Sequence, residues 1–271
     1  MKKLIHIESN DIVFTHRIDA PLTERLNVSH CHDSYEILYV AEGRGRYLIE
    51  GAAVEMLPRS LVIIRPFEYH CVEVDNKSVY ERYVINFSKN ALSKDTAKLL
   101  DNMLGEDSSH GRFFSPEVLL QTTISVFDRL EYANNLPERE RSVYLGLLLS
   151  ELLVLLSGTG SQRINNDEDE LGAKVARYIN DYLEMEISLD KLAKYFFVSK
   201  YYLCRSFKKY SGVSIHSYIN HKRVMYAKQL IDSGETASGA AYRVGFGDYS
   251  AFYRAYVKIL GKAPTHKSVK K

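Results

Sequence analysis

The chain has few cysteines, few prolines and no tryptophan, and the first two shortages exclude classes of protein. Its three cysteines, Cys31, Cys71 and Cys204, are widely spaced and odd in number. They support neither a disulfide framework nor a zinc site of the Cys-x-x-Cys type. Six prolines and fifteen glycines among 271 residues, without a low-complexity tract, exclude collagen-like and broadly disordered chains. We therefore expect reduced thiols in a globular protein.

Long hydrophobic runs are also missing. No apolar run approaches the ~18 to 20 residues that span a bilayer, and the first residues lead into charged positions instead of the apolar core of a secretory signal. We expect a cytoplasmic protein with no membrane partner. With 45% hydrophobic and 26% charged side chains, the length favours two globular domains.

Each half of the chain is poor in charge of one sign. Residues 1–170 hold 18 basic and 27 acidic side chains, whereas residues 171–271 hold 18 and 7. A basic segment of this size indicates a polyanion-binding domain, because Lys and Arg displace counterions from phosphates. A small, polar and acidic stretch precedes it and reads as a linker. We predict domains at 1–156 and 171–271, joined by a linker at 157–170.

The basic segment has the periodicity of short, capped helices. They are predicted from Leu171, after Ser188, from Lys200 to Tyr210, from Ser214 to Ile231, from Thr236 to Arg243, and from Asp248 to Leu260. We expect the long helix to bury Ile215, Tyr218, Ile219, Val224, Ala227 and Leu230. The helices after Ser188 and at Lys200–Tyr210 are repeated by those at Thr236–Arg243 and Asp248–Leu260. Leu203 and Phe207 match Phe252 and Tyr256 at a distance of 49 residues.

The same alignment places Arg205 opposite Arg254. Each repeat therefore predicts a helix-turn-helix whose second helix enters the DNA major groove, where an arginine can recognise guanine. A solvated helix face remains the alternative reading of these exposed positions.

Residues 188–267 resemble the DNA-binding domain of AraC-type (AraC/XylS) transcriptional regulators. The segments Val198–Lys209 and Ala241–Phe246, followed by Gly261–Pro264, carry the resemblance. It implies two helix-turn-helix units joined by a long helix. The resemblance and the basic helix faces together give the expected DNA-binding residues: Lys200, Tyr201, Cys204, Arg205, Lys208, Lys209, Tyr249, Ser250 and Arg254.

Some positions depart from the family pattern. Phe197 stands where the first turn needs a residue with positive φ, which costs about 1 kcal/mol for a side chain of this kind. Ala237 and Ala240 replace bulky aliphatic residues, and Gly239 lies inside a short helix. The second unit is therefore expected to be looser. His266–Ser268 lacks the family's aromatic-arginine pair, which affects only the closing contacts.

Residues 12–87 have the pattern of short strands, which predicts a small β-barrel or sandwich. The expected strands are Glu36–Val40, Arg46–Ile49, Leu61–Ile64, Val72–Val74 and Arg82–Phe87. The segments His30–Glu36 and Arg65–His70 resemble the two motifs of cupin barrels, a sensing domain that AraC-type regulators commonly carry first. In metal-binding cupins, residues of the types found at His30, His32, Glu36 and His70 converge on a divalent ion.

Two readings of this barrel remain open. The preferred one is a small-molecule pocket with no resident cofactor, whose polar lining would include His30, His32, Glu36, Arg44, Arg65, Tyr69 and His70. The other is a divalent metal held by the three histidines and Glu36. Ser60 and Phe67 take positions where cupins have glycine, so the loop that delivers His70 need not have enzyme-like geometry.

Residues 116–156 return to a helical pattern, broken by Asn134–Pro137. The segment Leu145–Leu156 is apolar almost all round, so more than one surface must cover it. The resemblance implies a helical dimer interface here, and core packing alone is the alternative.

The expected fold class is α+β with two domains: a cupin-like β-barrel with a helical dimerisation segment, then an all-α double helix-turn-helix. The expected function is a sequence-specific DNA-binding regulator, in the activator class, switched by a small molecule such as a sugar. Its expected partners are operator DNA, the effector, a second copy of the chain and RNA polymerase.

A metal-dependent cupin enzyme or metal sensor with a DNA-binding tail is the alternative, and a DNA-coating role comes third. We expect no enzyme, because the chain contains no Ser-His-Asp arrangement, P-loop or Rossmann fingerprint.

Overall fold

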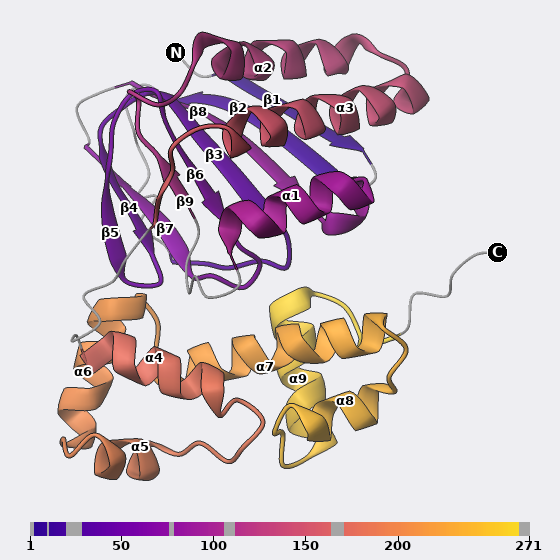
Figure 1. The fold of residues 1–271 in the computed structure, drawn as a ribbon. Helices are drawn as coiled ribbons and strands as arrows, with labels where there is room; N and C mark the ends of the chain where they lie inside the picture. The colour runs from indigo at the N-terminus through magenta and orange to yellow at the C-terminus, as the bar shows by residue number, and fades with distance from the viewer. Residues whose placement is uncertain are drawn as a thin grey trace. The chain divides into compact units, whose positions relative to one another are not determined.

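The computed structural model describes residues 3–9, 11–19, 29–75, 79–105, 112–163 and 171–265. The chain divides into two compact units, Met1–Asn166 and Asp167–Lys271 (Figure 1). In the described ranges, no helix combines the length and the apolar character that a membrane crossing requires.

The first unit contains two antiparallel sheets. The larger one has seven strands in the order β1-β2-β8-β3-β6-β9-β10, and the smaller has three in the order β5-β4-β7. The strands are β1 (Lys3–Ser9), β2 (Ile12–Asp19), β3 (Tyr35–Glu42), β4 (Gly45–Ile49), β5 (Ala52–Met56), β6 (Ser60–Ile64), β7 (His70–Val74), β8 (Tyr80–Phe87), β9 (Arg112–Phe114) and β10 (Gln162–Arg163).

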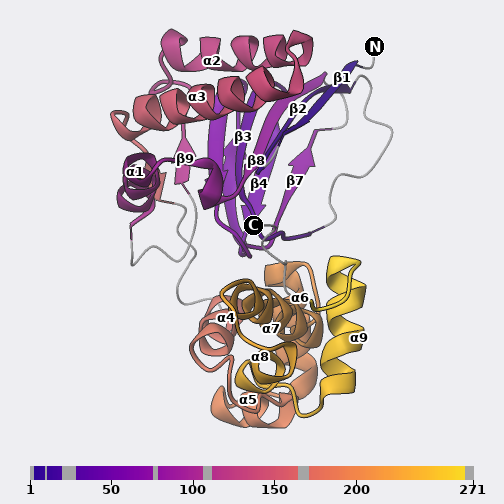
Figure 2. The same ribbon diagram turned by 90° about the vertical axis from the view of Figure 1, so that its right-hand side faces the viewer.

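The larger sheet separates two hydrophobic cores, and the alternation along β3 illustrates why. Ile37 and Tyr39 point into one core, whereas Leu38 and Val40 point into the other. The first core is closed by the helices α1 (Lys94–Leu104), α2 (Gln121–Tyr132) and α3 (Glu138–Ser157), which lie over one face of the sheet (Figure 2). The second core lies between the two sheets, as in a barrel.

Several elements of this unit differ from the expectations. The strands β1, β2, β5, β9 and β10 and the helix α1 were not among the predicted elements, although β2 lies in the region expected to form strands. The strands β9 and β10 are short and depend on their neighbours for their contacts. Ser93 caps α1 by accepting a hydrogen bond from the Thr96 backbone N–H. The helix predicted from Pro116 begins only at Gln121, and the predicted break at Asn134–Pro137 contains a short 3₁₀ turn, Ala133–Asn135.

The second unit is all helical and closely follows the periodicity of its sequence. Its helices are α4 (Leu171–Asp181), α5 (Leu189–Tyr195), α6 (Lys200–Ser211), α7 (Ile215–Asp232), α8 (Ala237–Arg243) and α9 (Tyr249–Leu260). Side-chain oxygens cap five of them, from Ser188, Ser199, Ser214, Thr236 and Asp248. The matched residues Leu203, Phe207, Phe252 and Tyr256 are all buried. The expected α+β class, with a β-rich first domain and a helical second one, is confirmed.

Two details of the second unit need comment. Phe197 has a φ of 55° and is 95% exposed, so the first turn does hold a strained phenylalanine. On α7, the predicted buried residue Leu230 is only half-buried. Ile231 is buried instead, because it lies at i+7 from Val224 and i+4 from Ala227 on the same buried face of the helix. The predictions for residues 164–170 of the linker and for His266–Ser268 lie outside the described residues.

Candidate functional site

The helix α6 presents an exposed face that is basic and aromatic. Tyr201, Arg205 and Lys208 lie at i, i+4 and i+7, so their side chains share this face, and Tyr201 is 76% exposed. Cys204 is a half-buried free thiol beside them. Lys200 pairs with Asp190 of α5 at 2.6 Å, and Lys209 is exposed. The buried Leu203 and Phe207 fix the opposite face, so these polar groups are free to point outward.

The helix α9 repeats the arrangement. Tyr249, Ser250 and Arg254 are exposed, while Phe252 and Tyr256 anchor the helix. Two further exposed residues, Tyr253 and Lys258, occupy the positions that correspond to Cys204 and Lys209 in the first unit. The prediction missed both, although the same 49-residue offset would have found them.

Three histidines and Glu36 come together at the end of the smaller sheet. One side-chain nitrogen of each of His30, His32 and His70 lies within 4.8 Å of the others. His30 and His70 form an isolated antiparallel bridge, with backbone hydrogen bonds of 3.0 and 2.9 Å. The structure thus brings together all four residues that the cupin resemblance singled out.

Backbone carbonyls hold the two inner histidines in place. His32 Nδ1 lies 2.9 Å from the Ser34 carbonyl oxygen, and His70 Nδ1 lies 2.8 Å from that of Glu68. A carbonyl only accepts, so each Nδ1 carries a proton and each Nε2 faces the cluster; His32 Nε2, which faces the Glu36 carboxylate, carries a proton as well. His70 Nε2 is buried and has no hydrogen-bond partner. Its distance of 3.8 Å from Glu36 Oε1 is too long for a hydrogen bond.

Glu36 is buried, and its two carboxylate oxygens have different surroundings. Oε2 accepts hydrogen bonds of 3.0 Å from both His32 Nε2 and Asn86 Nδ2. Asn86 stands directly opposite Glu36 in the β3–β8 register, a pairing that could not be read from the sequence. Among the described residues, Oε1 has no hydrogen-bond donor. The cluster therefore offers two neighbouring acceptors, Glu36 Oε1 and His70 Nε2.

The members of the cluster differ in their charge states near neutral pH. Burial raises the pKa of Glu36, but the hydrogen bonds and charge of His32, together with His70 and Asn86, outweigh it and lower the pKa to about 2. Burial opposes the charge on His32, yet its bond to Glu36 leaves its pKa raised. Burial dominates at His70 and lowers its pKa to about 4. Near neutral pH His70 is therefore uncharged and Glu36 is ionised beside His32.

The loop that delivers His70 contains a strained residue. Phe67 has a φ of 70°, in the left-handed region, at a position where cupins have glycine. Its backbone N–H donates to the His32 carbonyl oxygen at 2.8 Å. This bond ties the loop to the segment before β3 that carries His32.

Only one other predicted ligand-binding residue lies near the cluster. Tyr69, which precedes His70, is buried, and its phenol lies beside Cys31. Burial is the main cause that raises the pKa of this phenol, and the neighbouring thiol raises it further. The structure does not bring Arg65 to the histidines, because its Nη2 donates to the Leu104 and Gly105 carbonyl oxygens at the end of α1.

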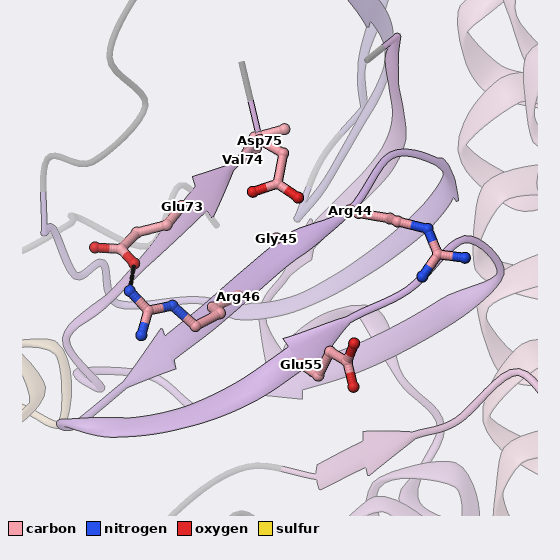
Figure 3. Close-up of a pocket in the computed structure, with 7 residues that line it drawn as sticks. All are labelled: Arg44, Gly45, Arg46, Glu55, Glu73, Val74 and Asp75. Carbon is pink, nitrogen blue, oxygen red and sulfur yellow. Dashed lines mark hydrogen bonds and ion pairs between the residues drawn. The ribbon is translucent and has the colours of Figure 1, made fainter. Parts of the chain in front are cut away.

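Arg44 lies in a separate groove on the smaller sheet (Figure 3). This groove has a cavity volume of about 280 Å³, and its lining consists of Arg44, Gly45, Arg46, Glu55, Glu73, Val74 and Asp75. Arg46 and Glu73 form an ion pair across it. Because both basic and acidic side chains line this exposed groove, its charge does not favour one class of ligand.

The space between the two sheets is largely filled. Tyr47, Met56 and Tyr80 are fully buried there with aliphatic side chains of β3 and β6. Tyr47 shares a hydrogen bond of 3.2 Å with Ser60, whereas the Tyr80 hydroxyl has no partner. In the described part of the barrel, the histidine cluster is therefore where several groups able to bind a polar ligand lie together, and the Tyr80 hydroxyl is a single further group.

Comparison with known proteins matches both units to described families. Residues 17–161 match the AraC-like ligand binding domain, and residues 192–267 match a helix-turn-helix domain. The first match spans more than half of the chain.

Relatives with the same arrangement are known. The uncharacterized HTH-type transcriptional regulator YbfI of Bacillus subtilis is 25% identical over 227 residues, which cover 82% of this chain and 80% of YbfI. The HTH-type transcriptional activator RhaS of Klebsiella pneumoniae is 27% identical over 245 residues, which cover 89% and 87%. A solved structure of an apo ToxT variant from Vibrio cholerae has a TM-score of 0.44 at 14% identity, over 95% of this chain and 97% of that one.

Proposed function

The chain belongs to the AraC family of transcriptional regulators with an N-terminal ligand-binding domain, and we propose that its α6 and α9 helices recognise one operator in double-stranded DNA. We further propose that a small molecule bound at the histidine cluster controls this recognition. The duplicated exposed faces carry this proposal. Each places an arginine, Arg205 or Arg254, at the same position of a capped helix that is anchored by two buried side chains.

The acceptor pair of Glu36 Oε1 and His70 Nε2 supports a ligand class. Two acceptors 3.8 Å apart need two donors from the ligand, and adjacent hydroxyl groups of a sugar supply them. We propose a sugar or a related polyol. Its control of DNA binding requires that it bind one arrangement of the chain better than another, and DNA must then change its affinity by the same factor.

The remaining expectations belong to this proposal. The relative RhaS is a transcriptional activator by name, which supports activation as the direction of control. We propose that this activation acts through contact with RNA polymerase. Chromosomal DNA as the target places the chain in the cytoplasm, and a binding function makes it a regulator and not an enzyme. The boundaries 1–156, 157–170 and 171–271 stay a prediction.

The first experiment is a titration of the full chain onto labelled DNA from upstream of its own gene, beside random DNA of equal length, at several salt concentrations. We expect a preference of about 1,000-fold for the upstream DNA and a steep salt slope. If upstream DNA shows no preference, operators selected from a randomised pool replace it. If the pool also yields no preferred sequence, sequence-specific regulation is wrong and DNA coating takes its place.

A dimer through α3 is the second part of the proposal. Leu145, Leu149 and Leu153 are buried toward the core, whereas Val143, Leu147 and Val154 are 62%, 65% and 58% exposed. Their spacing places these three on one helix face, where a two-fold contact would bury them.

Leu147→Ala tests this contact. We expect about 2 kcal/mol weaker dimerisation, since each copy would lose about 1 kcal/mol of apolar burial. Analytical ultracentrifugation measures it. Leu4→Ala is the matched control, because Leu4 is 66% exposed on β1. A dimer unaffected by Leu147→Ala, or no dimer in the wild type, contradicts the contact.

A second candidate function, metal sensing, is favoured by the orphaned His70 Nε2. Metal-ligating histidines usually donate their other N–H to a carbonyl, as His32 and His70 do. Three imidazoles and a carboxylate suit Zn²⁺ and other first-row divalent ions. His30, His32, His70 and Glu36 would hold the ion, which would serve as a sensed ligand.

Elemental analysis and titration with Zn²⁺ decide between the two candidates. A metal sensor takes up one ion per chain and loses it in His70→Ala, whereas the exposed His6 on β1 serves as the control through His6→Ala. Uptake that is absent, or equal in both variants, leaves the polyol as the proposed ligand.

A further inference from the structure

The helix α7 buries a charged side chain near its middle. Arg223 is 8% exposed, its Nε donates to the Leu183 carbonyl oxygen at 3.0 Å, and its Nη2 donates to that of Met185 at 2.6 Å. Both carbonyls lie in the segment between α4 and α5. The guanidinium therefore ties α7 to the chain that leads into the first helix-turn-helix.

The turn of the second helix-turn-helix closes on the same guanidinium. Gly245, between α8 and α9, has a φ of +90°, and a Cβ there would lie 2.7 Å from Arg223 Nη2 and 2.9 Å from the Glu184 carbonyl oxygen. The Phe246 ring centre lies 5.9 Å from Arg223 Cζ. The side chain of Arg223 on α7 thus contacts both the segment that precedes α5 and the turn that precedes α9.

Such a buried cation tolerates little rearrangement. Burial lowers the pKa of Arg223, which shows that the environment penalises its charge. The two carbonyls compensate only while they meet the planar fork of donors, because a guanidinium has fixed donor directions. A shift of either segment would leave a buried charge without acceptors.

The two DNA-facing helices depend on this junction for their relative placement. Figure 1 shows α6 near one end of α7, whereas α9 crosses α7 further along. Phe207 of α6 packs edge-on against Tyr218 of α7 at 5.2 Å, and Phe246 packs against Phe252 of α9 at 5.4 Å. Arg223 lies between these two contacts along the chain.

We infer that Arg223 is a positioning residue that sets the distance and angle between α6 and α9, so that the protein selects operators whose two sub-sites have one spacing. This inference rests on the proposed function. A rigid link between α6 and α9 lets the second helix-turn-helix bind DNA without a further loss of conformational entropy. On an operator with the wrong spacing, only one helix-turn-helix can then contact its sub-site.

The test uses the full chain and an operator selected from randomised DNA. Three DNAs are compared: the selected operator, the operator with one sub-site scrambled, and the operator lengthened between its sub-sites by about half a helical turn (~5 base pairs). Arg223→Met keeps most of the side-chain volume and removes the donors. Lys228→Met is the matched control, since it removes the same charge from α7 at a residue that pairs with Asp232 of the same helix.

We expect the wild type and Lys228→Met to lose about tenfold or more in affinity on the lengthened operator. Arg223→Met should bind the selected operator about tenfold more weakly and the scrambled one within about twofold of wild type, with little further loss on lengthening. A purely structural role would lower both affinities equally and keep the spacing preference.

Gly245→Ala approaches the junction from its other side and keeps the test valid if Arg223→Met does not fold. It should flatten the spacing preference in the same way. A wild-type spacing profile in the variants that fold, or equal losses on one and two sub-sites, overturns the inference. A wild type that selects no operator at all instead contradicts the proposed function.

Discussion

Replacing Arg205 with alanine is expected to lower affinity for the operator by about 1 to 3 kcal/mol per protomer, which is about 5- to 150-fold. Arg205 is exposed at the centre of the α6 outer face, with the buried Leu203 and Phe207 holding the helix from behind. The expected loss arises because an arginine can donate two hydrogen bonds to a guanine edge, and alanine leaves those acceptors unpaired. An operator that binds two protomers would lose about twice as much.

Lys208→Ala is the control for general charge, since Lys208 is exposed one turn further along α6. It should weaken binding to operator and random DNA alike and reduce the salt slope by about one. Fluorescence anisotropy with operator, random DNA and single-base variants measures both effects. If Arg205→Ala weakens operator and random DNA equally, Arg205 binds phosphate and does not read a base.

The second large effect is a loss of stability of the first unit in acid. The pKa of His70 is lowered from 6.5 to about 4 in the folded chain, mainly by burial. The unfolded chain therefore binds more protons between these values, and the free energy of unfolding should fall by about 3 kcal/mol as the pH drops through this window. Glu36, whose pKa is lowered from 4.5 to about 2, adds a further loss between those values.

His32 acts in the other direction. Its pKa is raised, so its contribution is fully present below pH 6.5 and is lost as the pH rises through the folded value. The net expectation is a first unit that is most stable near neutral pH. The effect of pH below neutrality should come mainly from His70 and then from Glu36.

His70→Asn tests this assignment, because the asparagine amide can donate to the Glu68 carbonyl oxygen as His70 Nδ1 does but does not titrate. Hydrogen exchange of peptides from residues 29–75, followed in urea at several pH values, reports the unfolding of this unit. The dependence between pH 6.5 and pH 4 should be shallower in the variant by about 3 kcal/mol. His6→Asn, at an exposed histidine, should keep the wild-type dependence. An unchanged slope in His70→Asn would show that other groups cause the acid sensitivity.

The helical unit was predictable because its information is local. Caps such as Ser199 and Asp248 and apolar pairs such as Leu203 and Phe207 act within one or two turns, so spacing alone reveals them. The repeat then locates Arg205 and Arg254 without any knowledge of packing. The same repeat also points to Tyr253 and Lys258, which correspond to Cys204 and Lys209.

The histidine cluster was predictable in part. Its four residues follow from a motif. Asn86 contacts them only because β3 pairs with β8. Arg65 does not, because its guanidinium binds a carbonyl oxygen at the end of α1 instead. Strand β5 was missed because a short segment takes its conformation from the sheet that it contacts. Helix α1, with 11 residues and a Ser93 cap, has local signals that the sequence prediction did not use.

Local spacing in the sequence thus determined the helices of the second unit, their caps and the duplicated basic faces, whereas the resemblance to cupin motifs indicated the four residues of the cluster. Tertiary structure alone decided which lone pairs are left without donors, why His70 is neutral beside an ionised Glu36, and which segments meet at Arg223. These properties depend on burial and on hydrogen bonds between residues far apart in the chain, and such contacts form only when the two sheets and the six helices of the second unit have packed.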